Sequence, residues 1–284
     1  MQNETEAGFA AGPPPGETSP PGGQRPAQRW SVGAEGFAAG PPPGETSPPG
    51  GQRPAKRWSV GAVIVDLDGT MVDTLGDFEV ALNRMLAELQ LPPVDRAFIE
   101  RTVGKGSEHL IRCVLAEQMR RLDQGDSACP AVQPEARYEH AWRSYQAHYR
   151  AINGDFSDVY PGVREGLAAL QARGLPMACL TNKPRAFALD LLRTKGLADY
   201  FSLVLGGDSF DRKKPDPMPL LRTCEALGVS PERTLMIGDS QNDALAARAA
   251  GCPVVLVTYG YNHGEPVRAV DADAHIDRLD QLLV

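Results

Sequence analysis

From residue 63 onward, short runs of apolar residues alternate with longer stretches in which apolar positions recur at spacings of three and four. The runs have the length expected of buried strands and lie at residues 63–65, 177–180, 203–205, 235–237 and 254–257. The spaced positions, such as Val163, Leu167 and Leu170, predict amphipathic helices between the runs. Strands that alternate with helices are typical of an α/β domain with a parallel sheet.

The strand signal disappears between residues 74 and 158, where the apolar positions follow helical spacing. These positions include Phe78, Leu82, Met85 and Leu89, and later Leu110, Ile111, Val114, Leu115 and Met119. A connection of this length inside a compact domain should have its own structure. We therefore expect a helical cap at residues 76–158, inserted into a core made of residues 62–75 and 159–284. A cap can exclude water from a site and select its substrate.

The first 61 residues differ from the rest of the chain and contain a duplication. Residues 8–34 recur as residues 36–62 with one change, from Gln28 to Lys56. Residues 1–61 hold 12 of the 25 prolines and 12 of the 29 glycines, so we expect a disordered tail without a part in catalysis. The tail is either a proline-rich docking segment or a tandem duplication or over-extended start, and the near identity of the copies favours the second.

Composition narrows the classes of function. The net charge of −7 argues against a general nucleic-acid binder or a binder of anionic membranes. The chain has no apolar run of about 18 residues and no secretory pattern after Met1, so we expect a cytoplasmic protein. The five cysteines are scattered without a Cys-x-x-Cys pair, which indicates neither a disulfide framework nor a zinc site.

Polar residues follow three of the predicted strands, at the points where the strands end. They are Asp66 and Asp68 after the first run, Thr181 and Asn182 after the second, and Asp239 and Asp243 after the fourth. Ligands bind beyond the carboxyl ends of strands in an open parallel sheet, so we expect these residues to share a crevice. Two acids one residue apart repel each other unless a cation or a shared proton relieves them, so Asp66 and Asp68 imply a bound metal or a coupled titration.

Each motif alone also has a purely structural explanation. The Asp66-Leu67-Asp68 segment can be a polar turn, and Thr181 or Asp239 can be a helix cap. Lys214, in Lys214-Pro215, can be a solvated loop charge. Four such loops in this order are much less expected from independent caps, and this favours a shared site.

The four motifs together resemble those of the haloacid dehalogenase superfamily of phosphohydrolases, and the likeness runs from Val63 to the C-terminus. The matching segments are Asp66-x-Asp68-Gly-Thr, Thr181-Asn, Lys214-Pro and Gly238-Asp239-Ser-x-x-Asp243. The resemblance implies a Rossmann-like core with an inserted cap. Asp68 is similar to an aspartate that the superfamily's phosphatases use as an acid and base and its dehalogenases lack. Residues 258–266, with Gly104-Lys105-Gly106, look like the bacterial phosphoglycolate phosphatase branch.

The resemblance implies a magnesium-dependent phosphomonoester hydrolase that acts through an aspartyl-phosphate intermediate. Asp66 would be the nucleophile, and Asp68 would protonate the leaving group and then activate water. The metal site is expected to comprise Asp66, the backbone carbonyl of Asp68, and Asp239. Asp243 is expected in the coordination sphere or beside it. Magnesium fits because it prefers oxygen ligands and screens the repulsion between a carboxylate and a phosphate.

The resemblance also assigns substrate-binding residues. Thr181 and Lys214 would bind phosphoryl oxygens, assisted by the amide of Asn182. Lys105, or a backbone amide of residues 104–106, would bind a carboxylate on a small phosphorylated metabolite, with 2-phosphoglycolate the expected substrate. The alternatives are another small sugar phosphate, a phosphomutase of the same superfamily and, from a different class, a non-catalytic binding module. We expect a monomer or homodimer without nucleic-acid or membrane partners.

Overall fold

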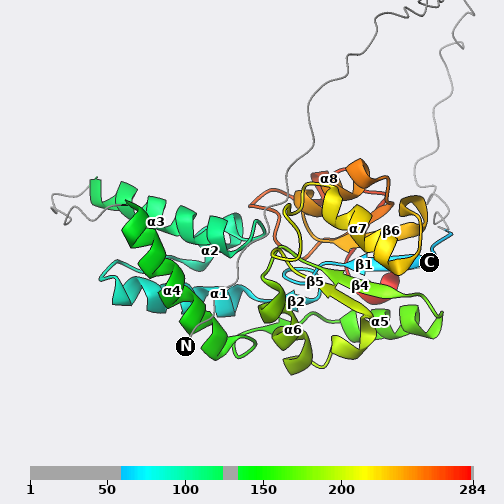
Figure 1. Ribbon diagram of the computed structural model, residues 1–284, viewed down its shortest axis with the longest axis horizontal. Helices are drawn as coiled ribbons and strands as arrows, with labels where there is room; N and C mark the ends of the chain where they lie inside the picture. The colour runs from blue at the N-terminus through cyan, green and yellow to red at the C-terminus, as the bar shows by residue number, and fades with distance from the viewer. Residues whose placement is uncertain (1–58, 124–133, 283–284) are drawn as a thin grey trace, which may run out of the picture. The chain divides into compact units, whose positions relative to one another are not determined.

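A six-stranded parallel sheet forms the core of the computed structural model, which describes residues 59–123 and 134–282 (Figure 1). The strand order is β5-β4-β1-β6-β7-β8. The strands are β1 (Ala62–Val65), β4 (Met177–Leu180), β5 (Leu203–Leu205), β6 (Thr234–Gly238), β7 (Val254–Val257) and β8 (Ala274–Ile276). The predicted parallel α/β sheet is confirmed, although the apolar pattern did not reveal β8. Since every pair of neighbouring strands is parallel, all the carboxyl ends lie at one edge.

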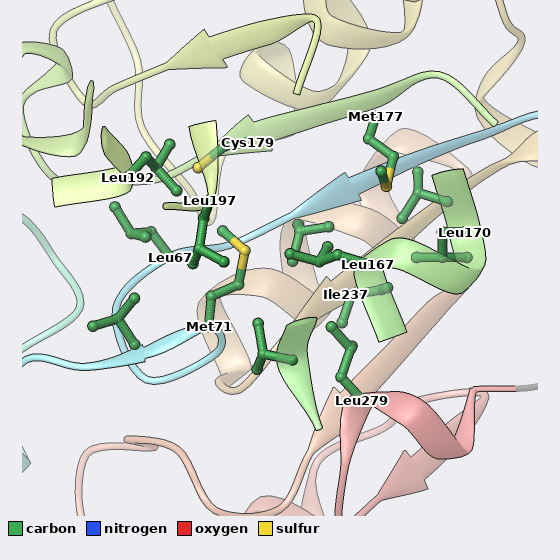
Figure 2. Packing of buried hydrophobic residues seen from close by; sticks show 14 of the residues in the cluster. Leu67, Met71, Leu167, Leu170, Met177, Cys179, Leu192, Leu197, Ile237 and Leu279 are labelled. Carbon is green, nitrogen blue, oxygen red and sulfur yellow. The ribbon is translucent and has the colours of Figure 1, made fainter. Parts of the chain in front are cut away.

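Helices cover both faces of this sheet, and the alternating side chains of β1 divide between the faces. The covering helices are α5 (Val163–Ala172), α6 (Arg185–Thr194), α7 (Met218–Leu227) and α8 (Gln241–Ala250). Val63 and Val65 belong to an apolar cluster with α5 and α6, and Ile64 belongs to a cluster with α7 and α8. Leu167 and Leu170 extend from α5 into the first cluster (Figure 2). The two-sided burial explains why the central strands read as unbroken apolar runs.

Four further helices lie between β1 and β4 in the sequence (Figure 1). They are α1 (Leu75–Glu88), α2 (Arg96–Thr102), α3 (Ser107–Asp123) and α4 (Pro134–Ile152). Their apolar side chains pack in one cluster, which Phe187 of α6 and Tyr261 also join. The ring of Phe78 in α1 stacks on that of Tyr149 in α4, with their centroids 5.5 Å apart. The helical spacing of residues 74–158 therefore predicted helices in this segment correctly, and the division into a cap at 76–158 and a core stays a prediction.

Short elements complete the fold. A two-stranded antiparallel pair joins the segments by which the chain leaves and re-enters the core, and it was not predicted. These elements are β2 (Val72–Asp73), β3 (Asp158–Val159) and the 3₁₀ turns η1 (Ala198–Tyr200), η2 (Pro231–Arg233), η3 (Val267–Ala269) and η4 (Leu279–Gln281). Within residues 59–123 and 134–282 no helix has the length and apolar character needed to cross a membrane. The predicted tail at 1–61 lies outside the described residues except for 59–61.

A buried carboxylate fixes the segment that follows α4. Asp77, in the first turn of α1, is fully buried. Its side chain accepts hydrogen bonds from the backbone N–H groups of Gly154, at 2.9 Å, and Phe156, at 2.8 Å. Buried backbone donors need acceptors, so Asp77 stabilises the return of the chain from the cap to the core.

Replacing Asp77 with alanine should lower the free energy of unfolding by about 2–4 kcal/mol, because two buried N–H groups lose their acceptor. The matched control is Asp190→Ala on α6, whose side chain is 60% exposed and 3.6 Å from Arg193. This surface ion pair should contribute under about 1 kcal/mol to the free energy of unfolding. Urea unfolding of both variants measures the difference, and equal losses would contradict the role given to Asp77.

Candidate active site

The residues that follow three neighbouring strands meet at the carboxyl edge of the sheet. Asp66 follows β1, Thr181 follows β4 and Asp239 follows β6. These strands are adjacent in the order β4-β1-β6. Asp66, Asp239 and Asp243 each place a carboxylate oxygen within 4.8 Å of the other two, and we call these three residues the acidic cluster. The fold thus concentrates negative charge at the predicted edge.

Lys214 reaches the acidic cluster from the loop after β5. Its Nζ lies 2.7 Å from Oδ1 of Asp243 and 3.1 Å from Oδ1 of Asp66, and it donates a hydrogen bond of 2.8 Å to the carbonyl of Leu180. Burial opposes its charge, yet Asp243 and Asp66 together hold the pKa of Lys214 above its ordinary value. The side chain therefore remains an ammonium and neutralises part of the cluster.

The positive charge of Lys214 does not fully neutralise the carboxylates of Asp66 and Asp239. Burial raises the pKa of Asp66 to about 7 against the opposing effect of Lys214, and Asp243 contributes to the rise. Burial, followed by the nearby charges of Asp243 and Asp66, raises the pKa of Asp239 well above its ordinary value. Such acids hold protons unless a cation replaces them. A set of converging carboxylate oxygens with a deficit of positive charge is suited to a hard divalent cation such as Mg²⁺.

Neighbouring loops orient the carboxylate of Asp239. Its Oδ1 accepts a hydrogen bond of 3.0 Å from the hydroxyl of Thr70, and its Oδ2 accepts one of 2.6 Å from the backbone N–H of Tyr261. Gly69 approaches the same carboxylate with φ of +80°, and a Cβ atom there would collide with it. Only glycine allows this turn together with this close approach, which explains why Gly69 follows Asp68.

Asp243 has a different environment, because both of its oxygens already have partners. Its Oδ2 accepts hydrogen bonds from the backbone N–H groups of Asp239 and Ser240, each at 3.2 Å, and from the Ser240 hydroxyl at 2.8 Å. Ser240 and Asp243 form a capping box at the start of α8, and Oδ1 of Asp243 contacts Lys214. With these contacts Asp243 is suited to orient Lys214 from a position beside a cation bound by Asp66 and Asp239.

The side chain of Asp68 contacts a lysine to which sequence analysis gave no role. Nζ of Lys183 lies 2.8 Å from Oδ1 of Asp68, and the two side chains are 2% and 12% exposed. The same Nζ lies 4.7 Å from the centroid of the Phe78 ring and 4.8 Å from that of Tyr149. Lys183 therefore links the Asp68 loop to cap helices α1 and α4. Its place just after a strand end was visible in the Thr181-Asn182-Lys183 segment, but its partners were not.

Asn182 ties the core loops to the cap. Its Nδ2 donates to the carbonyls of Gly104, at 2.9 Å, and Lys214, at 2.8 Å, while its Oδ1 accepts from the Lys214 N–H at 3.0 Å. The side chain thus has a structural role that sequence analysis did not predict. The hydroxyl of Thr181 accepts a hydrogen bond of 3.3 Å from the N–H of Lys183, which is a local turn contact. Thr181 is not a helix cap, because α6 begins at Arg185 and Pro184 occupies its N-cap position.

A pocket lies between this edge of the sheet and the cap. Its lining comprises Asp66, Asp68, Phe78, Val103, Gly104, Gly106, Ser107, Leu110, Thr181, Asn182, Lys183, Asp239, Ser240 and Tyr261. Gly104 and Gly106 therefore border the site, as the resemblance implied for their loop. Lys105 between them is exposed and is not part of the lining, so its contact with a substrate remains a prediction.

In protein stripped of divalent cations, Asp66→Asn should raise the free energy of unfolding at pH 8 by on the order of 2 kcal/mol. The pKa of Asp66 is about 7 in the folded protein and about 4 in an unfolded chain. The stability that its protonated form contributes is complete below the unfolded pKa and is lost as the pH rises through the folded pKa. The difference in the free energy of unfolding between Asp66→Asn and the parent should therefore vanish as the pH falls to about 4.

Urea unfolding of the two proteins between mildly acidic and mildly basic pH measures this difference. The matched control is Asp190→Asn, which removes a carboxylate from the exposed surface of α6 and should change the free energy of unfolding by under about 1 kcal/mol. An Asp66→Asn protein that is less stable than the parent at pH 8 would contradict the assigned electrostatics.

Comparison with known proteins agrees with this geometry. A phosphoglycolate phosphatase of Thiobacillus denitrificans is 45% identical over 218 residues, covering 77% of this chain and 92% of the relative. One encoded on a plasmid of Cupriavidus necator is 41% identical over 223 residues, covering 78% and 90%. The crystal structure of a predicted phosphoglycolate phosphatase from Haemophilus somnus aligns with a TM-score of 0.74 and 31% identity over 78% of this chain and 96% of that chain. The family model for haloacid dehalogenase-like hydrolases matches residues 63–257. The resemblance is confirmed: the chain belongs to the haloacid dehalogenase-like hydrolase family.

Proposed function

We propose that the chain is a magnesium-dependent phosphatase that hydrolyses 2-phosphoglycolate to glycolate and phosphate through an aspartyl-phosphate on Asp66. The observation that carries the proposal is the contact of Asp66 with Lys214 inside the acidic cluster. This arrangement offers a carboxylate nucleophile, a place for a hard cation and a fixed ammonium, which are the requirements of phosphoryl transfer. Membership of a hydrolase family and the relatives named phosphoglycolate phosphatase support it.

The residues present suit a magnesium ion. Asp66 and Asp239, together with the backbone carbonyl of Asp68, would hold it, and Asp243 would lie beside it because its oxygens are already paired. The bound ion would supply positive charge against the nucleophile and the phosphoryl oxygens. This charge would relieve the deficit that raises the pKa of Asp66 and Asp239.

In the first half-reaction, a carboxylate oxygen of Asp66 attacks phosphorus and the bond between phosphorus and the leaving oxygen breaks. The product is an acyl phosphate on Asp66. Lys214 and the Thr181 hydroxyl would bind the phosphoryl oxygens, with the backbone N–H of Asn182 assisting. Thr181 and Asn182 line the pocket, and Lys214 lies 3.1 Å from Asp66, so all three are near the transferred group.

Asp68 would move the protons of both half-reactions. It would donate a proton to the leaving oxygen of the ester, and as a carboxylate it would then accept a proton from the water that cleaves the acyl phosphate. Its side chain is 12% exposed and lines the pocket, so it faces the space in which the ester would bind. Lys183 restricts its orientation from the side of the cap.

The identity of the substrate rests on the relatives and on the pocket between cap and core. Phe78 and Leu110 of the cap line this pocket together with Asp66 and Asp239, an arrangement that favours a small phosphorylated metabolite. A carboxylate on the leaving group needs a polar or cationic partner, and the loop with Gly104, Lys105 and Gly106 was predicted to supply it. Two of these residues line the pocket, which supports a contact through the loop amides.

In the presence of Mg²⁺, the protein should release phosphate from 2-phosphoglycolate in preference to other small phosphomonoesters, and chelation should abolish the release. Asp66→Asn should lower kcat by at least about a thousandfold because the nucleophile is lost. Asp68→Asn should lower it by roughly 10²- to 10⁴-fold, since acid and base catalysis is lost. Phosphate release from a panel of esters checks all three expectations.

The matched control for both variants is Asp190→Asn, which should keep the rate of the parent. Faster release from another small sugar phosphate would retain the mechanism and replace the substrate. Isomerisation of a sugar phosphate without free phosphate would establish a mutase. Failure to release phosphate from any ester would contradict the proposed function and favour a binding module.

A further inference from the structure

We propose that Lys183 is the residue that selects a carboxylate on the leaving group of the substrate. This inference rests on the proposed function and names the recognition element of the same site. It assigns to a buried core lysine the task that sequence analysis gave to Lys105. Four observations support it: the position of Lys183 in the pocket, its fixed geometry, its distance from Asp68 and the exposure of Lys105.

Lys183 is the one basic side chain among the described residues that line the active-site pocket. Lys214 is not part of the lining, and the proposed mechanism commits its ammonium, beside Asp66 and Asp243, to the phosphoryl group. A substrate with both a phosphate and a carboxylate brings a second anionic group into a pocket that contains several acids. The ammonium of Lys183 is therefore the positive charge available to this second group.

The position of this ammonium is fixed by three contacts. Asp68 accepts its hydrogen bond at 2.8 Å, and the rings of Phe78 and Tyr149 lie 4.7 and 4.8 Å away. The side chain is only 2% exposed, so water competes weakly for its charge. An ammonium has three N–H donors, and Asp68 is its one hydrogen-bond acceptor among the described residues. Donors are therefore left for a ligand.

The contact with Asp68 places this charge near the correct part of the substrate. As the acid, Asp68 must come within hydrogen-bonding distance of the leaving oxygen. In 2-phosphoglycolate the carboxylate is attached to the carbon that carries this oxygen, so it lies only a few bonds from the proton donor. A cation 2.8 Å from Asp68 is thus within reach of the carboxylate. A phosphate ester without the acid group would make no use of it.

Lys105 is less suited to this role. It is exposed and is not part of the pocket lining, whereas its neighbours Gly104 and Gly106 are. A flexible exposed ammonium is strongly hydrated and pays more ordering entropy than a buried one. Recognition by Lys183 also brings the carboxylate into the space beneath Phe78, which belongs to the cap. Selectivity would then depend on contact between the cap and the core.

The test compares two esters that differ at one group, 2-phosphoglycolate and 2-hydroxyethyl phosphate. In Lys183→Met the value of kcat/KM should fall about 10- to 100-fold more for 2-phosphoglycolate than for 2-hydroxyethyl phosphate, mostly through KM. Lys183→Gln keeps a donor toward Asp68 but lacks the charge, so it should lose the same preference while retaining more activity on the neutral ester. Lys183→Arg keeps the charge and should restore part of the preference.

Lys213→Met is the matched control, because Lys213 is exposed and outside the lining of the pocket, and it should keep the preference of the parent. Equal losses for both esters in Lys183→Met and Lys183→Gln would show that the lysine acts only on Asp68 or on the fold, and would overturn the inference. Loss of the preference in Lys105→Met with its retention in Lys183→Met would also overturn it. A parent protein that hydrolyses both esters equally would contradict the proposed function itself, and this outcome is seen before any variant is measured.

Discussion

The ion contacts of Lys214 are the constraint on which the rest of the site depends. The fold brings Asp66, Asp239 and Asp243 within 4.8 Å of one another in a buried position, and such a group is unfavourable without positive charge. Lys214 contacts two of these acids directly. Asn182 holds the backbone of Lys214 in place for this pairing, through both the N–H and the carbonyl of the lysine.

A second lysine, Lys183, connects the candidate active site to the cap. Asn182 and Lys183 are consecutive, and each contacts the cap with its side chain: Asn182 at the carbonyl of Gly104, and Lys183 at the rings of Phe78 and Tyr149. Lys183 also contacts Asp68, the proposed acid and base. One short loop after β4 therefore contacts the backbone of Lys214, the side chain of Asp68 and the cap. A cap that moves relative to the core would change the surroundings of Asp68 directly.

Sequence patterns predicted those parts of the structure that follow from local physics. The unbroken apolar runs identified β1, β4, β5, β6 and β7 because these strands are covered on their faces by helices. The motifs at the strand ends gave the acidic cluster, since parallel strands place their carboxyl ends together. By contrast, β8 (Ala274–Ile276) has His275 between its two apolar residues and therefore lacks an apolar run, whereas β5, the other edge strand, consists of Leu203, Val204 and Leu205.

The sequence could not predict which residues contact each other when they lie far apart along the chain. Asp77 is an ordinary helical acid in the sequence, and its two acceptor contacts are made with residues 77 and 79 positions away. Lys183 was visible at a strand end, but the rings around it come from separate helices of the cap. Gly104 and Gly106 line the pocket with Asp66 and Asp68, whereas the exposure of Lys105 depends on how their loop contacts Asn182.

Capture of the covalent intermediate tests the central claim, that Asp66 is the nucleophile, most directly. With Asp68→Asn and 4-nitrophenyl phosphate, whose leaving group needs no proton from the enzyme, the first half-reaction should outpace the second. We expect a burst of about one nitrophenolate per active site and, after acid quenching, one phosphoryl group on the peptide that contains Asp66. A burst with the phosphoryl group on another residue, or steady release without a burst and without any labelled peptide, would contradict this claim.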